Sequence, residues 1–170
     1  MSSRTTTSRL DERAAIKTIL LATLVAGTLD ALAAIINYSI NGGKNPVKIF
    51  YFIASGVFGR EAAYSGGTLM AICGLLFHFL IAFLFSLFLF LIYPKLKQVL
   101  KNKFLIGLLY GVFIWLVMNK IVLPLSKAPK LPPDLKRDLI GMLILMFLVG
   151  LPIALIVDRH YSGRNDKAVY

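Results

Sequence analysis

Cysteine, acidic residues and charge of either sign are scarce in this chain. Of its 170 residues, one is cysteine, eight are Asp or Glu and 16% are charged, whereas a soluble domain usually carries about 25% charged residues. The lone Cys73 cannot form an internal disulfide, which disfavours a disulfide-stabilised scaffold. With 58% hydrophobic residues, the composition also disfavours a disordered chain and a soluble globular enzyme, because a domain of this size cannot hide so much apolar surface from water.

Catalytic and cofactor-binding motifs are also missing. The chain has no Gly-x-Ser-x-Gly, His-Glu-x-x-His, Cys-x-x-Cys or phosphate-binding loop, so we expect it not to be an enzyme. One imidazole at His78 and one carboxylate at Asp30 are too few ligands for a metal site. His78 also has no second axial candidate for haem at a matching depth. We therefore expect neither a metal nor a cofactor.

What the chain does have is long apolar runs flanked by Lys and Arg. A membrane-spanning helix needs roughly 17–25 mostly apolar residues, because the hydrocarbon core is about 30 Å thick. Segments at about 18–38, 68–93, 104–123 and 139–157 meet this requirement. The net charge of +11 lies around these runs, which indicates contact with anionic lipid and not with nucleic acid. The predicted fold is an all-α integral membrane bundle of four transmembrane helices.

The distribution of basic residues predicts the orientation of this bundle. The loop at 95–103 is the clearest case, since its charged residues are all lysines: Lys95, Lys97, Lys101 and Lys103. Because such loops stay in the cytoplasm, both chain termini are expected there as well. The chain then divides into a basic cytoplasmic segment at 1–17, a four-span membrane domain at 18–158 and a cytoplasmic tail at 159–170.

A shorter apolar segment lies between the first two spans. Asn45 and Pro46 are typical of a helix start, and the segment at about 46–58 that follows is too short to cross the hydrocarbon core. We expect an interfacial helix lying on the membrane or, alternatively, a re-entrant helix that plugs a cavity. In the second case the neighbouring glycines are candidate hinges: Gly59, Gly66 and Gly67.

Each span carries small residues on one face, often at four-residue spacing. In lipid, helices associate through such faces because they let the backbones approach closely. The predicted packing residues are Ala26, Gly74, Ala82, Gly107, Gly111 and Gly150. In the fourth span, Pro152 predicts a kink.

Two of these faces contain an ionisable residue near the middle of the membrane. Counted along the helices, Asp30 lies roughly 18 Å from one surface and His78 roughly 15 Å from the other. An isolated carboxylate at this depth costs at least about 2.5 kcal/mol, so Asp30 must be protonated, paired or beside water. We predict that Asp30 approaches His78 inside the bundle. The alternatives are an ion pair with Lys120 and, for each residue, a structural hydrogen bond between helices.

Other polar residues extend this predicted midplane cluster toward the outer surface. Lys120 lies near the outer end of the third span, where a lysine can also extend its amine to the interface. Asn37 and Asn119 are expected at similar outer depths, where they could hydrogen-bond to each other or line a vestibule. The full predicted cluster is Asp30, His78, Lys120, Asn119 and Asn37.

Several short motifs resemble those of a known family. The motifs are Ala26-Gly27-Thr28-Leu29-Asp30, Ile53-Ala54-Ser55-Gly56-Val57-Phe58-Gly59, Gly66-Gly67, Gly74-Leu75-Leu76-Phe77-His78-Phe79, Tyr110-Gly111, Met118-Asn119 and Val122-Leu123-Pro124-Leu125-Ser126. With them, residues 20–158 resemble a widespread group of small, uncharacterised bacterial four-helix inner-membrane proteins. The resemblance implies a bacterial cytoplasmic membrane and a four-helix architecture, and it implies no activity.

Two hypotheses on function follow. The first is a structural or accessory protein that stabilises a membrane assembly or its own oligomer, with Asp30 and His78 joining the helices. The second is a small oligomeric transporter or channel-like protein that uses this pair for proton or cation coupling. The first is slightly favoured because no residue pattern marks a substrate, whereas a water-accessible cavity at Asp30 would favour the second. The expected partners are the lipid bilayer and further copies of the chain or other membrane subunits.

Overall fold

The structure of the protein is a computed structural model that describes residues 3–130 and 132–167, in which all regular structure is helical. Four helical segments are long enough and apolar enough to cross a membrane. They are α1 (Ser3–Ile40), α4 (Gly67–Leu100), α5–η1–α6 (Lys103–Val117, Met118–Val122 and Leu123–Leu125) and α7–η2–α8 (Leu135–Ile144, Leu145–Gly150 and Leu151–Lys167). The prediction of an all-α protein with four potential membrane spans is therefore confirmed.

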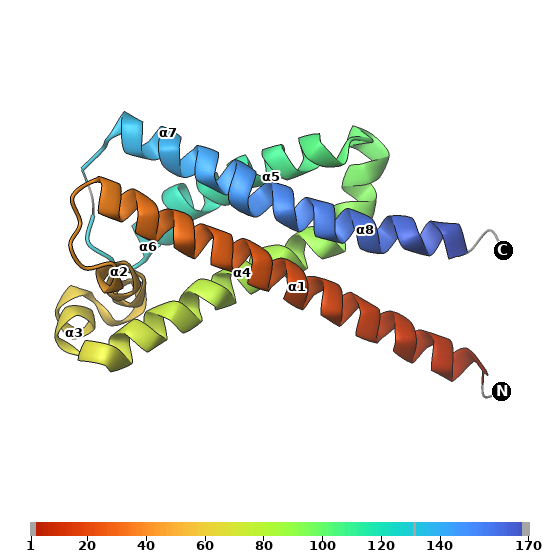
Figure 1. Cartoon of the computed structure of the whole chain (residues 1–170), viewed down its shortest axis with the longest axis horizontal. Coiled ribbons are helices and arrows are strands. Elements are labelled where there is room, and N and C mark those ends of the chain that lie inside the picture. Colours follow the sequence, from red (N-terminus) through yellow and green to blue (C-terminus); the bar gives the residue numbers. More distant parts are fainter. Residues whose placement is uncertain (1–2, 131, 168–170) are drawn as a thin grey trace.

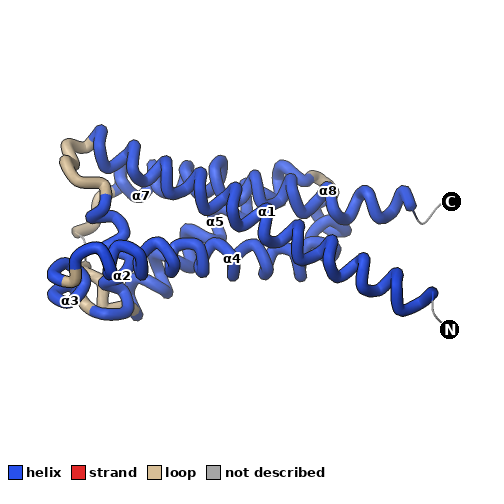
Figure 2. Tube along the Cα trace, turned by 60° about the horizontal axis from the view of Figure 1, so that its bottom comes forward, coloured by secondary structure: helices blue, strands red, loops and turns tan. Residues whose placement is uncertain are grey.

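The four segments run antiparallel, so that each reverses the direction of the one before it (Figure 1). Both termini and the α4–α5 turn lie at one end of the molecule, which we call the terminal end. The short helices α2 (Val47–Phe58) and α3 (Arg60–Ser65) and the connection from α6 to α7 lie at the other end, the α2 end (Figure 2). This arrangement puts the two termini and the lysine-rich 95–103 loop on the same side of a membrane, as the span count requires.

Three helices extend well beyond the predicted spans, namely α1, α4 and α8. Most of the 1–17 segment continues α1 as helix from Ser3, and the 159–170 tail continues α8 as helix to Lys167; residues 1–2 and 168–170 lie outside the described residues. In the second span the helix passes through Pro94 and ends at Leu100. A proline usually ends or kinks a helix because it cannot donate to the carbonyl four residues earlier. Here that carbonyl, of Phe90, instead accepts a 3.0 Å hydrogen bond from the Tyr161 hydroxyl of α8.

The other two membrane prolines each follow a stretch of wider, π-helical turns. The stretch η1 immediately precedes the α6 segment that contains Pro124, and η2 ends two residues before Pro152. Since a proline ring clashes with the carbonyl one turn before it, a locally widened helix is one way to accommodate it. The irregularity predicted at Pro152 is thus present as a π-helical stretch, and Pro124 has the same effect in the third span.

Glycines bring the third and fourth segments into backbone contact. A Cβ atom placed on Gly107 would lie 2.7 Å from the Cα of Leu151, and one on Gly150 would collide with the carbonyl oxygen of Gly107. Gly111 is in the same position against Met146. Because glycine has no side chain, α5 can pack directly on η2 and the start of α8, and no room is left for a larger residue at these three positions.

The tightly packed core occupies the half of the bundle nearer the terminal end. It combines residues of α1, α4, α5, η2 and α8, among them Ala22, Leu89, Ile106 and Ile153, each no more than 1% exposed. The half nearer the α2 end is packed less completely, and it contains the cavity described below.

Helix α2 lies across this less tightly packed half. It is seen nearly end-on in Figure 1, so its axis runs across the long axis of the molecule. Ala54 and Ser55 are fully buried, and Gly74 of α4 has no room for a Cβ because the Phe50 carbonyl lies against it. Helix α2 is therefore packed into the bundle along one face. It ends at Gly59, whose φ of +83° is a conformation that favours glycine.

Candidate functional site

A cavity of about 260 Å³ lies between the helices at the level of Asp30 and His78. Residues of α1, α4, α5 and η2 form its walls, and α2 with the chain around α6 closes it toward the α2 end. Its lining is mostly apolar: Ala26, Gly27, Phe52, Ile53, Gly56, Ile81, Ala82, Phe85, Ile114, Met118, Val122, Leu123, Ala128, Leu145 and Val149. Asp30 and His78 are its ionisable lining residues, and Ser126 adds a hydroxyl.

His78 is held in place by the backbone of the first span. Its Nε2 atom lies 2.8 Å from the carbonyl oxygen of Gly27, so Nε2 carries the proton and donates this hydrogen bond from α4 to α1. The adjacent Phe79 ring packs over Gly27, where a Cβ atom would lie 2.8 Å from that ring. Glycine at position 27 thus allows α4 to approach α1 closely enough for the imidazole to reach a carbonyl.

Asp30 lines the same cavity about one turn along α1 from Gly27. Its carboxylate interacts electrostatically with the His78 ring. Within the part of the chain that the structure describes, however, it has neither a hydrogen bond nor an ion pair. The structure therefore places Asp30 and His78 in one cavity, while the direct partner of the imidazole is a carbonyl group.

Lys120 and the two asparagines lie elsewhere. The Lys120 amine is 5.5 Å from the centre of the Trp115 ring and faces a second pocket, so it does not pair with Asp30. The Asn119 side chain donates a 3.0 Å hydrogen bond to the Trp115 carbonyl. The Asn41 side chain, just past the end of α1, donates hydrogen bonds to the backbone and side-chain oxygens of Asn37. Asn37 and Asn119 therefore each bond within their own segment, and Asn119 lines the second pocket.

Two of the predicted packing residues line the cavity, whereas the candidate hinge glycines lie outside its lining. Ala26 and Ala82 line its wall, on α1 and α4. Of the candidate hinges, Gly59 and Gly67 have positive φ angles of +83° and +57°, and a Cβ atom on either would have open space around it. Gly66 has an ordinary φ of −82°. Gly59 and Gly67 thus separate α2, α3 and α4 by backbone conformations that few other residues adopt.

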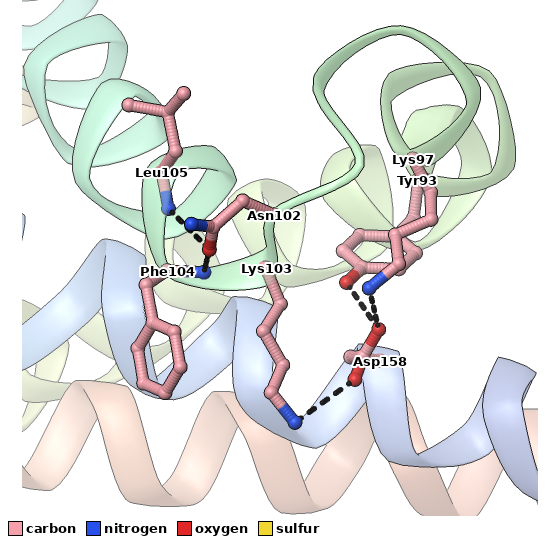
Figure 3. Close-up of polar contacts among 7 residues, drawn as sticks. All are labelled: Tyr93, Lys97, Asn102, Lys103, Phe104, Leu105 and Asp158. Carbon is pink, nitrogen blue, oxygen red and sulfur yellow. Dashed lines mark hydrogen bonds and ion pairs between the residues drawn. The ribbon is translucent and has the colours of Figure 1, made fainter.

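Sequence reasoning did not single out Asp158, which forms a polar cluster at the terminal end (Figure 3). This residue of α8 is only 5% exposed, and one of its oxygens accepts hydrogen bonds from the Tyr93 hydroxyl (2.8 Å) and the Lys97 amine (2.7 Å). The Lys103 amine lies 3.3 Å from its second oxygen. The available signal was topological: an acid at the end of the fourth span falls on the same side as the 95–103 loop.

Neither a metal centre nor a known relative identifies the cavity. Among the described residues there is no group of three or more His, Cys, Asp or Glu side chains arranged to hold a metal ion. In three comparisons, no protein-family model, no curated protein and no solved structure matches the sequence. The function must therefore be inferred from the geometry of this chain.

Proposed function

We propose that this protein is a small transporter or channel-like membrane protein that moves protons across the membrane by binding and releasing them at Asp30. The observation that supports this most directly is that Asp30 and His78 line the same cavity. Carboxylates and imidazoles inside a membrane are costly, and they commonly mark proton and ion pathways. A purely structural role would leave Asp30 in contact with a protein partner, and its carboxylate has none by hydrogen bond or ion pair among the described residues.

The two residues have different parts in this proposal. His78 donates a hydrogen bond from Nε2 to the Gly27 carbonyl, which fixes the orientation of the ring beside the cavity. Asp30 is the group that binds and releases the proton. The two side chains line the same cavity from neighbouring helices, Asp30 from α1 and His78 from α4.

The cavity reverses the order of the two hypotheses drawn from the sequence. An accessory protein in which Asp30 and His78 join the helices was slightly favoured, and the His78–Gly27 hydrogen bond agrees with that role for His78. Asp30 has no such bond in the described chain and lines a cavity, and for this reason we favour the transporter. We place the transporter in the bacterial cytoplasmic membrane with its termini in the cytoplasm. Since one four-helix chain has little room for a complete path, we propose that it acts as a homo-oligomer.

Proton flux into proteoliposomes tests this proposal. After an inward pH jump, vesicles with wild-type protein should acidify faster than empty vesicles, and the Asp30→Asn variant should retain less than about a tenth of the difference. Asparagine keeps the shape of aspartate but cannot carry a proton in this pH range. A pH-sensitive dye trapped inside the vesicles provides the measurement.

The matched control is Glu61→Gln, which removes an exposed acid outside the cavity. Its flux should equal that of the wild type. Equal flux in Asp30→Asn and wild type would overturn the role of Asp30, and wild-type flux no greater than that of empty vesicles would overturn proton transport itself.

A further inference from the structure

A second pocket of about 400 Å³ adjoins the cavity at the α2 end. The two share the lining residues Phe52, Leu123 and Ala128, so the two spaces lie next to each other along these side chains. Unlike the cavity, the second pocket is rich in polar and charged side chains. These are Asn119, Lys120, Lys130, Arg137 and Asp138.

The charges of this pocket are unbalanced. Arg137 is the one cation that has an acid nearby, with Nε 3.9 Å from Asp138, and it also donates to the Pro132 carbonyl. Lys120 contacts only the face of the Trp115 ring. Within residues 3–130 and 132–167, neither Lys120 nor Lys130 has a carboxylate partner. The pocket therefore presents two uncompensated ammonium groups beside an amide donor.

We propose that this second pocket binds the phosphate head of an anionic amphiphile whose apolar chain enters the cavity. Lysine amines and an amide N–H are suitable donors for phosphate oxygens. The shared lining residues then lie where head and chain meet, and the mostly apolar lining of the cavity suits a hydrocarbon chain. In this position the head lies at the level of the membrane surface, and the chain lies inside the protein at the level of the bilayer interior. Membrane lipids have the same orientation. This proposal concerns binding alone and does not depend on proton transport at Asp30.

The chain contains its own reporter for this site. Trp115 is the only tryptophan among the 170 residues, and the Lys120 amine lies over its ring. A phosphate that draws this amine away changes the surroundings of the indole, so binding should shift the fluorescence of Trp115. No added label is needed.

The test is a titration of the full-length protein in an uncharged maltoside detergent with octyl phosphate, inorganic phosphate and octyltrimethylammonium. Octyl phosphate should bind, whereas the other two should bind at least about tenfold more weakly, since one lacks the chain and the other the negative charge. Equal binding of inorganic phosphate would assign the pocket to the free ion and overturn the amphiphile. Equal binding of octyltrimethylammonium would overturn recognition of the anionic head.

Variants locate the two parts of the ligand. Lys130→Gln should weaken octyl phosphate binding about tenfold. The matched control Lys136→Gln, an exposed lysine at the same end but outside the pocket, should leave binding unchanged. An equal loss in both variants would show general charge attraction and overturn the site.

A bulkier residue in the cavity tests the position of the chain. Val122 lines the cavity and is 37% exposed, so Val122→Phe can be accommodated while filling part of the space. It should weaken octyl phosphate binding and leave the weak binding of inorganic phosphate unchanged. Unchanged octyl phosphate binding in this variant, with an unaltered elution volume and circular dichroism spectrum, would overturn entry of the chain into the cavity.

Discussion

At the scale of single residues, Asp158 and Asp30 are two acids in opposite situations. Asp158 is almost fully buried, and a phenol and two lysine amines contact its oxygens. Asp30 faces a cavity without such partners in the described chain. Because burying a charge is costly unless a partner compensates it, Asp158 has the contacts of a structural residue, whereas Asp30 lacks the contacts that such a role requires.

Removing the charge of Asp158 should destabilise the protein. Asp158→Asn leaves Lys97 and Lys103 without their negatively charged partner and should lower the free energy of unfolding by about 1–3 kcal/mol, which is less than for a fully buried ion pair because both lysines are partly exposed. The melting temperature in detergent measures this loss. Lys95→Gln, at an exposed lysine in the same region, is the control, and equal melting temperatures for the two variants would contradict a structural role.

At the scale of helical elements, irregular positions are compensated by neighbouring segments. The Phe90 carbonyl, which Pro94 leaves without a donor in its own helix, is satisfied by Tyr161 of α8. Before Pro124 and Pro152 the helices widen into η1 and η2. The element that carries η2 is also the one that packs on glycines of α5, so a widened backbone and a close helix contact occur together.

The contact between α5 and η2 predicts a large effect from one methyl group. Gly150→Ala places a Cβ atom against the Gly107 carbonyl and should lower the free energy of unfolding by about 1–3 kcal/mol, because the two backbones must move apart. In contrast, Gly163→Ala adds its methyl group in open space on α8 and should be neutral or slightly stabilising. Thermal melting of both variants gives the comparison; a stable Gly150→Ala protein would show that this contact can relax.

At the scale of the whole molecule, the bundle is packed unevenly along its length. Buried apolar side chains fill the half near the terminal end, whereas the half near the α2 end contains the cavity and the charged pocket. Helix α2 covers this second half, and glycines with positive φ angles bound the α2–α3 pair. The packed half lies between the cavity and the terminal end, and α2 with the chain around α6 covers the cavity on its other side.

The antiparallel arrangement predicts which sites are accessible from each side of the membrane. In a Cys73→Ser background, a membrane-impermeant maleimide should label Lys48→Cys and Lys136→Cys in intact cells. It should label Lys95→Cys and Ser162→Cys only after the membrane is opened, if the termini are cytoplasmic as the basic residues indicate. The inverse pattern would reverse the orientation, and labelling of Lys48→Cys and Lys95→Cys from the same side would contradict the four spans.

Some helix ends were harder to predict than the helices themselves. The second span was predicted to end at about residue 93, whereas its helix continues through Pro94 to Leu100, and the Tyr161 hydroxyl of a distant helix bonds to the carbonyl that Pro94 leaves free. The first span was predicted to begin at about residue 18, whereas its helix begins at Ser3 and so includes most of the 1–17 segment. Such ends depend on what lies beside the helix, which local composition does not reveal.

The sequence by itself determined the class of the protein. Apolar runs of membrane length produce spanning helices in any arrangement, because every backbone group in lipid must bond within its own helix. It also predicted that Asp30 and His78 lie at a similar level along the bundle, since helical rise is constant, and both line one cavity. Only the tertiary structure decided that His78 bonds to Gly27, that Lys120 faces a second pocket and that Asp158 joins Lys97 and Lys103. These contacts depend on how each helix is rotated and how closely it packs, and many distant residues set both quantities together.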